Sequence, residues 1–336
     1  MKKFVLRPGE KGVTALETRE MSVRKLKSHE VAVRVHAASL NYRDLITANQ
    51  GVSHELIPLS DGAGTVEETG EGVTRLRRGD RVVGLFFPRW QEGEIDEYKF
   101  SSARGGEPTD GMLAQIVYGP EESFLKFPEY LSFQEASTLP CSGLTAWNAL
   151  VVNGKLKPGE TIVIMGTGGV ALFALQLAKT MGARVVLLSG SEKKIEKARG
   201  MGAEEIINYR ENPDWHNLVL EKTSRVGADL VLELGGGGTL AKSMAAVKIH
   251  GRISLVGVLT GFTDQINPLP ILRKSLSING IYVGSQEMQE EFHRALETNN
   301  IHPAIDSVFP FDGVKDAYEY MQSARHMGKI VINVDG

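Results

Sequence analysis

Apolar and polar residues follow two different patterns along the chain. Up to about residue 125, short alternating runs are separated by glycine, proline and aspartate, which is typical of close-spaced strands in an antiparallel barrel or sandwich. A polar insertion between Pro88 and Gly111 has no period, and we expect it to be a long surface loop that lies over a site as a lid. The strands expected here are Lys3–Arg7, Val13–Thr18, Val31–Ala38, Gly64–Glu68, Arg81–Phe86 and Met112–Val117.

From about residue 130, apolar strands alternate with amphipathic helices. This alternation predicts an α/β domain with a doubly wound parallel sheet and right-handed crossovers. Beyond about Pro268, two helices precede a closing strand, Lys329–Val334. The expected strands of the sheet are Thr161–Met165, Arg184–Ser189, Glu205–Tyr209, Ala228–Leu234 and Arg252–Val258, and the expected helices are Glu192–Gly200, Trp215–Thr223, Thr239–Val247, Gln286–Thr298 and Asp312–Ala324.

A glycine-rich turn joins the first of these strands to a helix. Its sequence, Gly166-Thr167-Gly168-Gly169-Val170-Ala171, fits G-x-G-x-x-G/A in the required strand–turn–helix context. Gly166 permits the tight turn, Gly168 lets the backbone approach a pyrophosphate, and the free amides at the helix start face the anion. The sequence therefore predicts a dinucleotide site, with a purely structural turn as the alternative.

The end of the second strand bears on the choice of cofactor. An acidic residue about 20 positions after the glycine turn would bind the ribose diol of NAD. Here Ser189 and Gly190 end the strand, and Lys193 and Lys194 follow, which favours the 2′-phosphate of NADP. In the alternative, the lysines form a solvated helix face and Glu192 binds the ribose of NAD.

Two further groups of residues are candidates by position. The turns at Gly235–Gly238 and at Gly257-Val258 follow later strands, at the carboxyl ends where ligands bind in open α/β sheets, although they could be simple turns. Asn41-Tyr42-Arg43-Asp44 follows a strand of the first domain and begins a helix. Asn41 would serve there as a helix cap without any functional role.

The composition narrows the class of protein. A chain of 336 residues is long enough for two domains, and a net charge of −3 does not favour nucleic acid or an anionic membrane as a partner. The start lacks a secretory apolar core and no apolar run is long enough to span a membrane, so we expect a soluble cytoplasmic protein. The single cysteine, Cys141, excludes an intrachain disulfide and a cysteine-rich zinc site, and the histidines show no H-x-x-x-H spacing.

Several short motifs, taken together, indicate a resemblance to a known protein family. These motifs are Asn41–Asp44, Pro58–Gly64, Gly79–Val82, Leu139–Trp147, Gly166–Ala171, Gly202-Ala203, Asn208-Tyr209 and Gly328–Val331. With these, the chain resembles the medium-chain dehydrogenase/reductase family, in its zinc-free, quinone-oxidoreductase-like branch. The resemblance implies a chaperonin-10 (GroES)-like β-barrel at 1–128, a Rossmann domain at 129–270, a tail at 271–336 that completes the first domain, and a homodimer or homotetramer.

The resemblance also implies a site and a reaction. The positions that hold zinc in metal-bearing relatives carry Asn41, Ser60 and Cys141 here, so we expect no metal. Hydride addition to a quinone or an α,β-unsaturated carbonyl needs no metal, because the conjugation of the substrate spreads the developing charge. The candidate donors to the enolate oxygen are Asn41, Tyr42 and Arg43, with Asp44 orienting the turn; by similarity, Lys194 and Tyr209 would contact the 2′-phosphate and Thr145 would lie near the nicotinamide.

Several alternatives stay open. Reduction of enoyl thioesters is less favoured, because Gly51-Val52-Ser53 stands where that branch looks as if it carries a tyrosine. A zinc-independent alcohol or aldehyde dehydrogenase using NAD(P) is the nearest alternative enzyme. An NADPH-binding sensor or structural protein without turnover is an alternative from another class, and an S-adenosylmethionine-dependent methyltransferase fits the family marks poorly.

Overall fold

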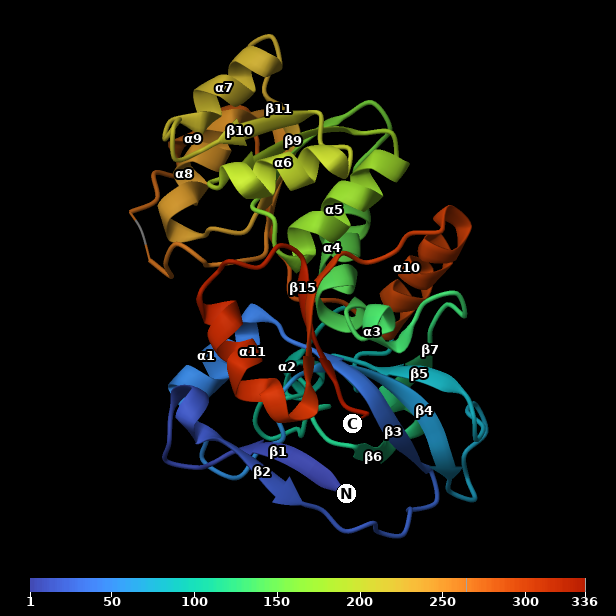
Figure 1. Cartoon of the computed structure of the whole chain (residues 1–336). Helices are drawn as coiled ribbons and strands as arrows, with labels where there is room; N and C mark the ends of the chain where they lie inside the picture. The colour runs from blue at the N-terminus through green and yellow to red at the C-terminus, as the bar shows by residue number, and fades with distance from the viewer. Residues whose placement is uncertain (264, 336) are drawn as a thin grey trace. The chain divides into compact units, whose positions relative to one another are not determined.

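The computed structural model describes residues 1–263 and 265–335, and the chain forms two compact units. The first unit combines residues 1–144 with the segment from Gly284 onward, and the second spans Thr145–Val283 (Figure 1). Within the described residues, every helix is too short or too polar to cross a bilayer.

The first unit is built on a seven-stranded sheet. Its main order is β14-β15-β3-β4-β5-β7, and β6 also pairs with β3. The closing strand β15 (red in Figure 1) therefore lies beside β3 (blue), and pairs with it antiparallel. The strands are β3 Glu30–Ser39, β4 Asp61–Thr69, β5 Arg81–Gly84, β6 Ile116–Pro120, β7 Phe124–Lys126, β14 Ile305–Pro310 and β15 Lys329–Asn333, with a separate hairpin of β1 Lys2–Leu6 and β2 Leu16–Glu20.

Short helices cover this sheet. The predicted strand at Val13–Thr18 is wrong in its first half, because a 3₁₀ turn spans Gly12–Ala15 and β2 starts only at Leu16. Gly12 has φ +69°, a backbone conformation that an extended strand does not adopt. The helices are α1 Tyr42–Gln50, α2 Glu97–Phe100, α3 Phe133–Ala136, α10 Gln286–Asn299 and α11 Val314–Gln322, together with a π-helical stretch, Leu139–Gly143, that leads into α4 Leu144–Trp147.

The insertion between Pro88 and Gly111 is exposed over residues 92–98, as expected of a surface loop, but its two ends are anchored in the fold. It contains α2 and buries the side chains of Trp90 and Arg104. The Arg104 guanidinium donates hydrogen bonds to the carbonyl oxygens of Leu85 (3.2 Å) and Ser123 (3.4 Å). The sequence did not predict that Arg104 is buried, because the groups that accept its hydrogen bonds belong to residues outside the insertion.

The second unit is a six-stranded sheet with all strands parallel. Its order, β10-β9-β8-β11-β12-β13, becomes 3-2-1-4-5-6 when the strands are counted from β8, which is the Rossmann arrangement predicted for this half. The strands are β8 Thr161–Met165, β9 Arg184–Ser189, β10 Glu205–Asn208, β11 Ala228–Glu233, β12 Val247–Leu255 and β13 Ser277–Gly280, and the helices are α5 Gly169–Thr180, α6 Glu192–Gly200, α7 Trp215–Lys222, α8 Gly237–Ala246 and α9 Leu269–Lys274.

The two compact units divide after Leu144 and after Val283. The π-helical stretch before the first division is bonded to the first unit, where the Cys141 amide donates to Asp61. Before the second division, β13 extends the parallel sheet by pairing with β12.

Candidate active site

A cluster of buried polar side chains lies in the first unit, where three neighbouring strands begin or end. Asn41 follows β3, Asp61 begins β4 and Lys329 begins β15. Because β3 pairs with both β4 and β15, these three residues converge although they are far apart in the sequence. Ser60 and Ser142 complete the cluster, and all five side chains are at most 6% exposed.

The Asn41 side-chain amide is held by several partners. Its Oδ1 accepts hydrogen bonds from Lys329 Nζ at 2.6 Å and from Ser142 Oγ at 3.1 Å. Its Nδ2 donates to Ser60 Oγ at 3.4 Å, near the upper limit for such a bond. The Asp61 carboxylate is also hydrogen-bonded to the Asn41 side chain, and since a carboxylate only accepts, the donor is Nδ2, which thus has two partners inside the cluster.

Asp61 is the acidic member of the cluster. Its Oδ1 accepts from Ser60 Oγ at 2.8 Å, and its Oδ2 accepts from the Cys141 amide at 3.3 Å. Burial raises the pKa of the Asp61 carboxyl, and the Lys329 ammonium, 3.8 Å from Oδ2, opposes part of that rise. The opposite charges of Lys329 and Asp61 thus compensate each other inside the fold.

Asp44 lies in the first turn of α1 and accepts the Asn41 backbone N–H at 2.7 Å, so it holds the turn as expected. Its second oxygen, Oδ1, is buried without a hydrogen-bond partner among the described residues, as is the hydroxyl of Tyr318 on α11. Burial raises the pKa of Asp44 to about 7, against the weaker opposing effect of Arg43.

The other two residues of the Asn41–Asp44 motif are placed differently. Tyr42 is 49% exposed. Arg43 donates from Nη1 to the carbonyl oxygen of Arg104 at 2.7 Å, and its guanidinium lies over the Phe86 ring, 4.9 Å from the centroid. The structure therefore brings Asn41 and Asp44 into the buried cluster, while Arg43 is engaged with the insertion.

The positions that correspond to zinc ligands in metal-bearing relatives do not form a site that fits Zn²⁺. Asn41, Ser60 and Cys141 offer an amide, a hydroxyl and a thiol, and Asn41 Oδ1 already accepts from an ammonium. Cys141 is the only one of the three with a side chain that commonly binds zinc, and one thiol beside an amide and a hydroxyl is a poor ligand set for tetrahedral Zn²⁺. Among the residues described, no three His, Cys, Asp or Glu side chains are grouped to hold a metal ion.

The glycine-rich turn of the second unit fits a pyrophosphate. Gly166 has φ +77°, and α5, a helix of 12 residues, begins at Gly169, so the amides of Gly169 and Val170 lie in its first turn. A Cβ added at Gly166 or at Gly168 would meet no protein atom within 4 Å. The backbone there is open to close approach by a ligand, while Thr167 between them is buried.

Ser189, Gly190 and Tyr209, three of the residues proposed for the 2′-phosphate site, lie together at the carboxyl end of β9. The Tyr209 amide donates to the Ser189 carbonyl at 3.1 Å, and a Cβ on Gly190 would lie 2.6 Å from the Tyr209 ring. On α6, Lys194 is partly buried whereas Lys193 is exposed. The Glu192 carboxylate accepts from Asn208 Nδ2 at 2.6 Å. This is the carboxylate that would bind the ribose of NAD in the alternative, and it already has one hydrogen bond within the protein.

The turns after β11 and β12 are bound to each other at the same edge of the sheet. Fully buried Glu233 accepts from the amides of Gly235 (2.7 Å) and Gly236 (3.0 Å) and from Thr239 Oγ1 (2.6 Å). A Cβ at Gly257 would lie 2.4 Å from the Leu234 carbonyl oxygen, and the Cα of Val258 lies against Gly236. These glycines are needed for close backbone packing, which is the structural alternative to ligand binding.

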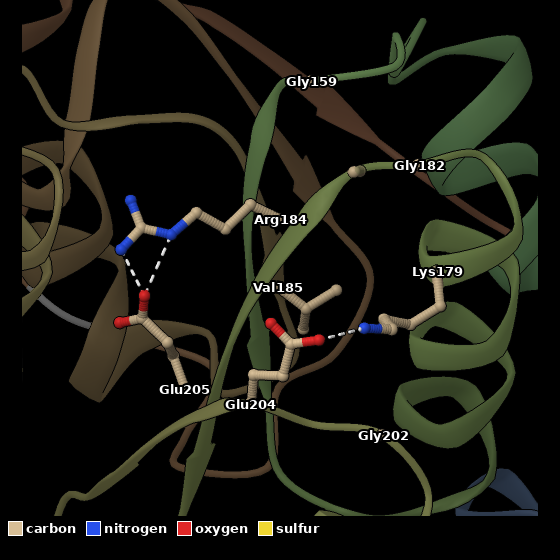
Figure 2. Close-up of a pocket in the computed structure, with 9 residues that line it drawn as sticks. Gly159, Lys179, Gly182, Arg184, Val185, Gly202, Glu204 and Glu205 are labelled. Carbon is tan, nitrogen blue, oxygen red and sulfur yellow. Dashed lines mark hydrogen bonds and ion pairs between the residues drawn. The ribbon is translucent and has the colours of Figure 1, made fainter.

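One cavity of about 190 Å³ lies at the opposite edge of the second unit's sheet, where β9 and β10 begin. Its charged side chains pair with one another, Lys179 with Glu204 and Arg184 with Glu205 (Figure 2). Parallel α/β sheets bind ligands at the carboxyl ends of their strands, so we assign no cofactor to this cavity.

Two sets of site residues escaped the sequence analysis. Lys329 and Ser142 entered it only as parts of family motifs, and Glu233 did not enter it at all. A charged residue at the start of the otherwise apolar strand Lys329–Asn333 was a usable signal for Lys329, because a lysine is rarely buried unless it is paired. Glu233 at the end of an apolar strand before four glycines offered a similar signal. Thr145, the remaining predicted cofactor residue, is buried in α4.

Comparison with known proteins agrees with this architecture. Residues 27–129 match the alcohol dehydrogenase GroES-like domain, and residues 169–299 match the zinc-binding dehydrogenase model. A zinc-type alcohol dehydrogenase-like protein of Schizosaccharomyces pombe is 39% identical over 99% of both chains, and human quinone oxidoreductase is 26% identical over 91% of this chain and 89% of its own. A crystal structure of a putative alcohol dehydrogenase from Sinorhizobium meliloti superposes with a TM-score of 0.91 at 38% identity, covering 99% of both chains.

A GroES-like barrel joined to a Rossmann unit with a glycine-rich turn after its first strand defines an oxidoreductase of a family that uses a nicotinamide cofactor. The chain belongs to the medium-chain dehydrogenase/reductase family, as its motifs predict.

Proposed function

We propose that this oxidoreductase transfers hydride from NADPH to a quinone or an α,β-unsaturated carbonyl without a metal ion. The observation that carries the proposal is the buried cluster of the first unit. There, an ammonium and neutral hydrogen-bond donors occupy the neighbourhood in which metal-bearing relatives would hold zinc.

The chemistry follows from what this cluster offers. NADPH, when bound, supplies the hydride that the β-carbon of the conjugated carbonyl receives, and negative charge then develops on the substrate oxygen. Asn41 Nδ2, whose contact with Ser60 is long, is the donor suited to that oxygen. The substrate's α-carbon then takes a proton from water. Oxidation of a simple alcohol would instead need a stronger electrophile to stabilise the alkoxide, which this donor set does not supply.

Preference for NADP rests on the residues at the end of β9. Ser189 carries no charge to repel a phosphate, Lys194 follows on α6, and the Glu192 carboxylate is bonded to Asn208. A carboxylate free to bind the ribose diol would favour NAD instead.

The test is a cofactor-oxidation screen across quinones, enones and aldehydes with both NADPH and NADH, with and without a chelator, on protein whose metal content has been measured. We expect NADPH-dependent reduction of quinones or enones that the chelator does not affect. Chelator-sensitive alcohol oxidation by protein with stoichiometric metal would refute the proposal. Metal-free activity confined to alcohols or aldehydes would favour a zinc-independent dehydrogenase, and tight NADPH binding with no turnover would favour a sensor or structural protein.

We also propose that the protein acts in the cytoplasm as a homodimer or homotetramer, in keeping with the family likeness. Light scattering on the purified protein should give two or four times the mass of one 36.7 kDa chain, and a monomer would contradict the proposal.

A further inference from the structure

Lys329 is a buried cation that donates hydrogen bonds to two oxygen atoms. Its side chain is 3% exposed, and its Nζ donates to the Leu40 carbonyl oxygen and to Asn41 Oδ1, each at 2.6 Å. Removing an ammonium from water costs several kcal/mol, so a protein keeps one inside only where its contacts offset that cost. The contacts here involve one residue of the proposed chemistry, Asn41.

We propose that Lys329 is a positioning residue of the active site, which fixes the Asn41 side-chain amide so that Nδ2 rather than Oδ1 faces the substrate oxygen. The inference rests on the proposed function, because it concerns the donor that stabilises the developing negative charge.

The physical argument concerns the two ends of an amide. An asparagine side chain rotated by a half-turn has almost the same shape but exchanges a donor for an acceptor. An ammonium can only donate, so with Lys329 Nζ at 2.6 Å the near end of Asn41 must be its oxygen. In the rotated state, an NH₂ group would oppose the ammonium and an oxygen would face the substrate oxygen. The Asp61 carboxylate, which can only accept, favours the same orientation from the Nδ2 end, whereas the Ser142 hydroxyl can donate or accept and does not choose between the two states.

Lys329 also limits the effect of the nearest negative charge. Asp61 is fully buried, and its Oδ2 lies 3.8 Å from Lys329 Nζ. Without the ammonium, an uncompensated carboxylate at this place would oppose the negative charge that develops on the substrate. Both effects act on the reaction step more than on cofactor binding, since the residues proposed for NADPH belong to the second unit.

The test is a double-mutant cycle with Lys329→Met and Asn41→Ala, measured with the best enone or quinone of the screen. We expect Lys329→Met to lower kcat by about 10- to 100-fold and to leave the Kd for NADPH within about twofold. In the Asn41→Ala background the same change should have little further effect, because the amide it orients is gone. Lys329→Arg, which keeps a cationic donor, should retain part of the activity.

Lys274 provides a matched control in the second unit. Its Nζ donates to the carbonyl oxygens of Met244, Ala245 and Val247 at 2.7–2.9 Å, one acceptor more than Lys329 has, and its side chain is partly buried. Lys274→Met removes comparable contacts away from the cluster, so it should lower the melting temperature while leaving kcat unchanged. Additive losses in the cycle, or a loss of kcat in Lys274→Met equal to that in Lys329→Met, would overturn the proposal.

Melting temperatures of the same four proteins give a readout that needs no turnover. Because Lys329 and Asn41 are bonded, the double variant should lose less than the sum of the single losses; additive losses would refute the contact. A wild type that binds NADPH and reduces nothing would refute the proposed function, while the thermal cycle would still decide the contact. Should Lys329→Met fail to fold, Lys329→Arg and Ser142→Ala should each lower kcat without weakening NADPH binding, and no change in either variant would overturn the proposal.

Discussion

Lys194 offers a direct test of the cofactor assignment. It lies in the first turn of α6, partly buried, just after Ser189 and Gly190 at the end of β9. Its neighbour Lys193 has the same charge but is exposed. Changing each to alanine therefore removes one positive charge from the same helix turn and separates direct contact with a phosphate from a general effect of charge.

The magnitude follows from the strength of one charged hydrogen bond. A bond between an ammonium and a phosphate contributes about 1.5–3 kcal/mol in favourable settings. Because Lys194 is only partly buried, screening by water reduces the expected loss to about 1–2 kcal/mol. That loss corresponds to a Kd for NADPH weakened by roughly 5- to 30-fold.

The measurement is the Kd of each cofactor by fluorescence titration of the wild type and the two variants. Lys194→Ala should weaken NADPH by this factor, leave NADH within about twofold, and lose its effect as salt is raised. Lys193→Ala should change both cofactors little. Equal weakening of NADPH and NADH in Lys194→Ala, or no weakening of either, would refute the assignment of the phosphate to this residue.

Three further experiments, with five variants, test the fold and the site. Burial raises the pKa of Asp44 to about 7 from an ordinary value of 3.8, so between these pH values the folded state holds a proton that the unfolded state loses. Wild-type stability should therefore fall as the pH rises from about 4 to 7. Asp44→Asn should flatten this dependence in thermal melts, and an unchanged slope would exclude Asp44 as its source. Glu233→Leu leaves buried donors unpaired and should lower the free energy of unfolding by about 3 kcal/mol or more in urea titrations, whereas Glu233→Gln, which keeps an acceptor, should cost less; equal losses would contradict the hydrogen-bond argument. A Cβ at Gly64 would lie 2.1 Å from the Arg34 carbonyl oxygen, so Gly64→Ala should abolish soluble folded protein. In the control Gly200→Ala, the added Cβ meets no atom within 4 Å, so this variant should be tolerated. A well-folded Gly64→Ala would show that β3 and β4 can separate.

The sequence predicted best those elements whose signals are local. Arg184–Ser189 and Glu192–Gly200 have the predicted bounds, because a run of buried residues is followed at once by turn residues and a helix start. The strands β13 and β14 were not predicted. Their residues are at most partly buried, so no apolar run distinguishes them from loops. Burial of Arg104 within the insertion was also not predicted, because the carbonyl groups that accept its hydrogen bonds lie outside the insertion.

The candidate site shows the same division. The glycine turn at Gly166 could be read directly, since strand, turn and helix are contiguous. Asn41 became a candidate through a family motif, but its contact with Lys329 joins residues 288 positions apart, and no local pattern reports such a pair. Sequence reasoning therefore named Asn41 as a candidate and did not name Lys329, the residue bonded to it.

The position of β15 in the first unit has a consequence for folding during synthesis on the ribosome. The strands β3 and β4, with Asn41 and Asp61, are synthesised more than two hundred residues before Lys329, and β3 lacks its β15 partner until then. A nascent chain therefore holds an acidic side chain whose cation has not been made and a strand edge open to wrong pairing. We expect this site to gain its charge balance only after Lys329 has been synthesised, so chains truncated before β15 should be inactive and prone to aggregate.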